Sequence, residues 1–205
     1  MIVSIKIANR RIDMKKITSI LIALLIMVSF VACENTSAPT SNPPASNELN
    51  DLDALSEKYL APLVLAGITI DSWSNANEIL PPRIAIFYAA VKDIEDGVGQ
   101  TNWDTAALDA SDVETLVQKY FDVSTDVLHD APYYDAASNT YKFESLGGAA
   151  GFGVVGANSD GSKLILSYEY YSPADDVTVI REGELTINID GNDYKYVSCT
   201  TNSVD

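Results

Sequence analysis

The stretch NSDGSKLILSYEYY, residues 158–171, decides the fold of this chain. Polar and apolar side chains alternate from Lys163 to Tyr171, which predicts a strand with one buried face. The side chains on that face are Leu164, Leu166, Tyr168 and Tyr170. The Asp160-Gly161 pair before the strand predicts a hairpin turn, because glycine readily takes a positive φ. The stretch therefore predicts an antiparallel pair of strands whose two buried tyrosines belong to the core.

Similar patterns on either side extend the pair into a sheet. The candidate strands are Thr140–Glu144, Phe152–Ala157, the run formed by Val177–Arg181 and Leu185–Ile189, and Tyr194–Thr200. A second glycine-containing turn, Asp190–Asp193, joins the last two. Short strands joined by such turns predict an antiparallel meander.

Helical patterns come earlier in the chain. Apolar residues at helical spacing predict helices at Leu49–Leu60, which Pro62 would limit or kink, and after Pro81 and Pro82. A third, Ser111–Phe121, carries a capping-box pair, Ser111 and Glu114. Helices followed by strands predict an α+β fold, with N-terminal helices packed on an antiparallel sheet of four to five strands. By analogy, a cystatin-like or NTF2-like roll is the nearest architecture.

The first 32 residues predict a secretory signal. The apolar run ITSILIALLIMVSFV, residues 17–31, follows Met14-Lys15-Lys16 and is short for a membrane-spanning helix. A complete signal starts at Met14, so we hypothesise that Met14 is the true initiator and that residues 1–13 are a gene-start error. Residues 33–48 are rich in Ser, Asn and Pro and predict a flexible linker. The folded domain is therefore expected over residues 49–205.

The signal ends in Phe30-Val31-Ala32-Cys33, which resembles the lipobox of bacterial prolipoproteins, with Phe30 where that family usually has leucine. The resemblance implies cleavage before Cys33, a diacylglycerol thioether on its sulfur and retention at the extracytoplasmic face of the cell membrane. The alternatives are an ordinary signal peptide cut near Ala32, or an uncleaved anchor. Two acyl chains hold a protein on a bilayer stably, whereas one does so only marginally.

A second, less specific resemblance covers roughly residues 110–200. The segments KYFDVS, PYYD and KYVS are similar to those of an uncharacterised family of lipoproteins from Gram-positive bacteria. This family brings no established catalytic residues.

Charge excludes one class of partner. Residues 1–32 hold five basic side chains and one acidic one, so residues 33–205 keep 8 of the 13 basic and 28 of the 29 acidic residues, a net charge of −20. Such a surface repels phosphates, and we therefore expect no binding of nucleic acid. A cationic partner fits this charge, and so does simple solubility.

The residues able to carry chemistry form no complete set. His129 is the only histidine, and Cys199 is the only cysteine besides Cys33. We expect Cys199 to be a buried apolar residue and His129 to be a satisfied or surface residue near a helix end. The glycines of GFGVVG, residues 151–156, are interpreted as bulge or bend residues, because no helix follows to hold a dinucleotide. The sequence predicts no catalytic, cofactor-binding or metal-ligating residues.

Eleven tyrosines suggest a recognition surface instead. We take Tyr133, Tyr134 and Tyr171 as the candidate binding residues, since Tyr171 points away from the predicted core. The leading hypothesis is a membrane-anchored surface lipoprotein that binds a protein or an envelope polymer without catalysis. The alternatives are a hydrolase that uses paired carboxylates, among them Glu182 and Glu184, and a structural component of the envelope.

Overall fold

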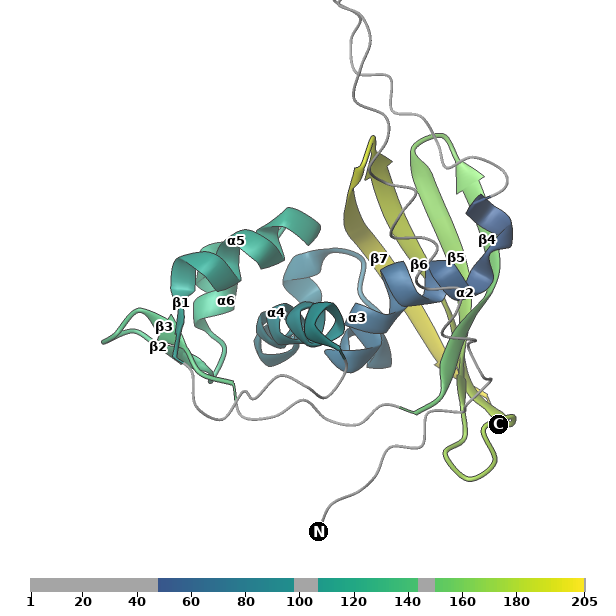
Figure 1. Cartoon of the computed structure of the whole chain (residues 1–205), viewed down its shortest axis with the longest axis horizontal. Coiled ribbons are helices and arrows are strands. Elements are labelled where there is room, and N and C mark those ends of the chain that lie inside the picture. Colours follow the sequence, from purple (N-terminus) through teal and green to yellow (C-terminus); the bar gives the residue numbers. More distant parts are fainter. Residues whose placement is uncertain (1–47, 98–106, 144–149, 205) are drawn as a thin grey trace, which may run out of the picture. The chain divides into compact units, whose positions relative to one another are not determined.

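The computed structural model of the chain describes residues 48–97, 107–143 and 150–204 (Figure 1). Helical elements fill the first part of this range and long strands fill the last, so the predicted α+β class is confirmed. The signal region, Cys33 and the linker up to residue 47 lie outside the described residues. Within the described residues, no helix combines the length and apolar character needed to cross a membrane.

The main sheet has four antiparallel strands in the order β4-β5-β6-β7. They are β4 (Phe152–Asp160), β5 (Lys163–Tyr171), β6 (Val179–Asp190) and β7 (Asp193–Ser203). Gly161 and Gly191, both at φ 61°, form the predicted turns. The pairing of β4 with β5 shifts between Val154 and Gly156, which places the expected bulge inside the glycine-rich segment.

A second, small sheet has the order β1-β3-β2. Its strands are β1 (Leu108–Asp109), β2 (Tyr134–Asp135) and β3 (Thr140–Tyr141). The strand predicted from Thr140 therefore forms in this sheet and not beside the meander. Asn139, at φ 53°, closes the tight turn that folds β3 back onto β2, which explains the local pairing.

The first helical run continues past Pro62. It comprises η2 (Glu48–Asn50), α2 (Leu52–Leu55), the π-helical turn η3 (Ser56–Leu60) and α3 (Ala61–Leu65). The π turn ends just before Pro62, so the hydrogen-bond register of the helix changes at the point where proline supplies no N–H. The 3-10 turns η4 (Ile68–Ile70) and η5 (Ala76–Glu78) then lead to α4 (Pro81–Asp96), which begins at the two prolines as predicted.

Two further helices are α5 (Ala110–Tyr120) and α6 (Thr125–His129). The predicted capping box was wrong: α5 begins before Ser111, and Asp109, its N-cap residue, makes no side-chain capping bond. The Glu114 carboxylate instead lies 2.8 Å from Nε2 of His129 on α6. Glu114 therefore contacts a side chain of the neighbouring helix α6, and not the backbone at the start of its own helix.

The core lies between the helices and the inner face of the main sheet, and Figure 1 shows α3 to α6 on one side of the four strands. Leu164, Leu166, Tyr168 and Tyr170 are buried on that face, as predicted.

Tyr168 pairs with Gly183 of β6, and its hydroxyl donates to the Thr200 carbonyl at 3.0 Å. A Cβ at Gly183 would lie 2.1 Å from that carbonyl oxygen and 2.4 Å from the Tyr168 hydroxyl. Gly183 thus makes the space in which Tyr168 packs.

We expect Gly183→Ala to lower the free energy of unfolding by about 3 kcal/mol, because the methyl group would overpack a rigid part of the core. The measurement is urea unfolding followed by circular dichroism. Gly156→Ala is the matched control, since its Cβ would meet the Ser167 side chain at an ordinary 3.7 Å and should cost less than about 1 kcal/mol. Equal losses in the two variants would contradict this account of Gly183.

Candidate functional site

The three tyrosines expected to form a binding surface lie in two different sheets. Tyr133 and Tyr134 belong to the small sheet region, and Tyr171 ends β5 of the main sheet. All three are half-buried. The structure therefore brings Tyr133 and Tyr134 together and places Tyr171 in separate surroundings.

Two of these tyrosines are engaged in packing. The Tyr134 ring stacks on the His129 ring with centroids 3.8 Å apart, and its hydroxyl donates to Asn139 at 2.9 Å. Tyr171 lies against Gly151, just before β4, and Gly153 of β4, and a Cβ at Gly151 would meet the Tyr171 Cβ at 3.5 Å. Burial, followed by the nearby Glu169 carboxylate, raises the Tyr171 pKa. These two tyrosines therefore have local structural roles.

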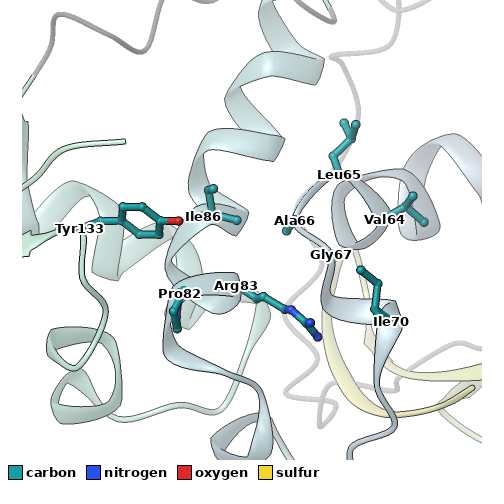
Figure 2. A pocket seen from close by; sticks show the side chains of 9 residues that line it. All are labelled: Val64, Leu65, Ala66, Gly67, Ile70, Pro82, Arg83, Ile86 and Tyr133. Atoms are coloured by element: carbon teal, nitrogen blue, oxygen red, sulfur yellow. The ribbon is translucent and has the colours of Figure 1, made fainter. Parts of the chain in front are cut away.

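Tyr133 lines an open apolar groove of about 300 Å³ (Figure 2). One wall comes from α3 and η4, the other from the first turns of α4. The residues that line it are Val64, Leu65, Ala66, Gly67, Ile70, Pro82, Arg83, Ile86 and Tyr133. Three separate segments thus converge here, which sequence spacing alone does not reveal.

The groove is apolar along its walls and polar at two points. Figure 2 shows the Tyr133 hydroxyl directed toward Ile86, and Arg83 extending from α4 toward the segment of Gly67 and Ile70. The Arg83 guanidinium forms an ion pair with Asp71. Ile70 is 41% exposed although it is a large aliphatic residue. Such a surface is suited to an apolar group of a partner, with a hydroxyl and a guanidinium to orient it.

The outer face of the main sheet carries a second depression, of about 280 Å³, surrounded by carboxylates. Glu169 of β5 stands directly opposite Glu182 of β6, and Glu184 follows on the same face. Like charges in directly opposed positions destabilise a sheet. Glu182 and Glu184 were among the carboxylates that the sequence suggested, whereas Glu169 was not, because only the strand register reveals that it faces Glu182.

Cys199 and His129, the lone thiol and imidazole of residues 48–204 that the structure describes, are both held by contacts within the fold. Cys199 is a buried free cysteine whose Sγ lies 3.2 Å from the Tyr168 hydroxyl. Burial raises the pKa of its thiol to about 11, so the thiol stays protonated at neutral pH. His129 contacts Glu114 and Tyr134, as expected for a satisfied histidine at a helix end. Among the described residues, no cluster of His, Cys, Asp or Glu is arranged to hold a metal ion.

Comparison of this chain with protein-family models, with curated proteins and with solved structures found no match.

We expect the domain to unfold cooperatively at alkaline pH. Burial raises the pKa of Tyr170 to about 12 and that of Cys199 to about 11, and it also raises the pKa of Tyr194 and Tyr196. The folded state thus holds these protons more tightly than the unfolded chain, in which tyrosine titrates near pH 10. Their stabilising contribution is complete below the unfolded pKa and is lost as the pH rises through the folded values.

The measurement is ultraviolet absorbance of tyrosinate during a base titration, recorded together with circular dichroism. The expected result is a late rise in tyrosinate that coincides with loss of secondary structure. Titration of all eleven tyrosines near pH 10 in a protein that stays folded would contradict the burial seen here.

Proposed function

We propose that this chain is a lipid-anchored protein of the extracytoplasmic membrane face, and that its domain binds a partner protein or an envelope polymer without catalysis. The signal-like segment that ends at Cys33 supports the anchor. The apolar groove of Figure 2 carries the binding part of the proposal. It leaves aliphatic surface exposed on a strongly acidic chain, and exposed apolar patches commonly mark contact sites.

The burial of Cys199 and the contacts of His129 within the fold support binding over catalysis. The Cys199 thiol is buried and protonated, and the His129 ring is stacked and hydrogen bonded within the fold. A hydrolase is the second candidate, and the observation in its favour is the group of Glu169, Glu182 and Glu184 around the outer depression. Glycoside hydrolysis needs two carboxylates held at a defined separation across a cleft.

The anchor is tested by replacing Cys33 with serine in the native host. We expect Cys33→Ser to abolish lipid attachment, so that the protein leaves the membrane fraction and its electrophoretic mobility changes. The measurement is fractionation followed by immunoblotting, together with mass spectrometry of the N-terminal peptide. Cys199→Ser is the matched control and should leave both properties unchanged. Unaltered membrane retention of Cys33→Ser would refute the anchor.

The groove is tested by photo-crosslinking in the full-length, membrane-anchored protein. A photoreactive amino acid replaces Ile70 in the groove or, to sample the outer depression for comparison, Val155, which lines that depression and is similarly exposed at 44%. We expect the Ile70 position to yield one discrete crosslinked species, and Ile70→Glu to prevent capture of the same partner by a probe at Pro82.

Two results would count against binding at the groove. One is crosslinking that is equally strong, and to the same species, from Val155. The other is turnover of an envelope polymer that is lost in Glu182→Gln while no partner is retained, which would favour the hydrolase.

A further inference from the structure

A short line of lysines and tyrosines crosses the boundary between the helices and the main sheet. We call it the Lys–Tyr row and define it as Lys58, Tyr194, Tyr120 and Lys119. Lys58 comes from η3, Lys119 and Tyr120 end α5, and Tyr194 lies near the start of β7. Segments far apart in the sequence therefore build one surface feature.

The row consists of two neighbouring tyrosine rings, each with a lysine ammonium against it. The rings of Tyr120 and Tyr194 are 5.0 Å apart between centroids, and both are half-buried. The Lys58 ammonium lies 4.7 Å from the centre of the buried Tyr59 ring and 5.9 Å from that of Tyr194, and the Lys119 ammonium lies 5.3 Å from the Tyr120 ring centre. Cation–π attraction holds each ammonium over its ring.

The rings are fixed from below by buried aromatic residues. Tyr59 packs edge-on against Tyr194 at 4.8 Å, and Phe87 packs edge-on against Tyr120 at 5.6 Å. Tyr196 contacts Tyr194 at 5.5 Å and anchors its own hydroxyl on the Tyr59 carbonyl at 2.9 Å. A platform held in this way needs little ordering when a ligand binds, which favours affinity.

The two lysines are weakly engaged by acidic groups. Lys58 forms no ion pair within the described parts of the chain. Lys119 lies 4.0 Å from Asp193, whose side chain is 78% exposed, so water screens that contact. Both ammonium groups are therefore available to an anionic ligand, in a chain region where only 8 basic residues accompany 28 acidic ones.

From this arrangement we infer that the Lys–Tyr row binds an acidic glycan, whose sugar rings pack against the exposed parts of Tyr120 and Tyr194, beside the two ammonium groups, while anionic groups contact Lys58 and Lys119. The inference rests on the proposed binding function and adds a surface distinct from the groove. Tyrosine offers a flat apolar face together with a polar hydroxyl, which suits a sugar ring. The two cations lie against different rings, so we expect the ligand's charges to be separated by uncharged ring surface.

The overall charge argues against a densely charged polyanion. The net charge of −20 on residues 33–205 repels any polymer that carries a charge on every unit. Salt limits that repulsion to about 8 Å at physiological ionic strength. A sparsely charged glycan meets little of this repulsion and still reaches both lysines, whereas polyphosphate or nucleic acid meets all of it.

The test measures binding of three probes to the full-length protein in detergent by titration calorimetry. The acidic probe is a hyaluronan oligosaccharide, which carries one carboxylate on every second sugar. The neutral probe is a chitin oligosaccharide of the same length, and the dense anion is polyphosphate. We expect the acidic probe to bind most tightly, and its binding to weaken when salt shortens the screening length from about 10 Å to about 3 Å.

The variant that tests the row is the double substitution Lys58→Gln and Lys119→Gln. Its matched control is Lys142→Gln with Lys163→Gln, which removes the same charge from two exposed lysines elsewhere. We expect the row variant to bind the acidic probe about tenfold more weakly, as the loss of two exposed ion contacts implies, and the control to bind as the parent does. Thermal unfolding verifies that both variants are folded.

Four outcomes would overturn the inference: equal binding by the two double variants, equal binding of the neutral probe, equal binding of polyphosphate, or no binding of the acidic probe to folded protein. None of these affects crosslinking from Ile70. A failure of the row is therefore distinguishable from a failure of the proposed function.

Discussion

Covering the apolar face of a four-stranded sheet is the constraint on which this domain depends. Strands β5 to β7 place alternate large side chains on one face, and each fully buried aliphatic or aromatic side chain contributes roughly 1.5–3 kcal/mol. The cover is centred on three aromatic rings. Phe87 of α4 contacts Phe121, just past α5, at 4.9 Å, and both contact Tyr196 of β7, at 5.9 and 5.1 Å. Helices and sheet therefore form one core.

Residues that precede α4 in the chain cover parts of both edges of the sheet. On β4 the Val154 N–H donates to the Ser56 hydroxyl at 2.7 Å, and that hydroxyl donates to the Leu52 carbonyl. On β7 the backbone of Trp73 exchanges hydrogen bonds with Cys199, while the Thr201 N–H donates to the Ser72 hydroxyl. Such cover prevents strand addition by another chain at these points. A partner would accordingly contact side-chain surfaces of this domain and not these parts of its strand edges.

The sequence was a good guide wherever a pattern is local. Alternation between Lys163 and Tyr171 and the Asp-Gly turn predicted β5 and its pairing, and two prolines marked the start of α4. Patterns that depend on distant neighbours were misleading. Glu114 matched a capping box but pairs with His129, and Tyr171 alternated outward yet is half-buried against Gly151. Neither the groove nor the Lys–Tyr row could be predicted, because each gathers residues from three elements whose packing no local period encodes.

Charge decides how the proposed surfaces can work together. With a net charge of −20 on residues 33–205, the domain is repelled by anionic bilayer headgroups, and the anchor we propose would hold it near the membrane without drawing its surface onto it. Contacts at the groove and at the row act over a few ångströms, well inside the screening length. Long-range repulsion would then exclude densely charged polymers before either surface is reached. Selectivity would thus arise from the acidic surface as a whole, and affinity from a small number of apolar, aromatic and cationic groups set within it.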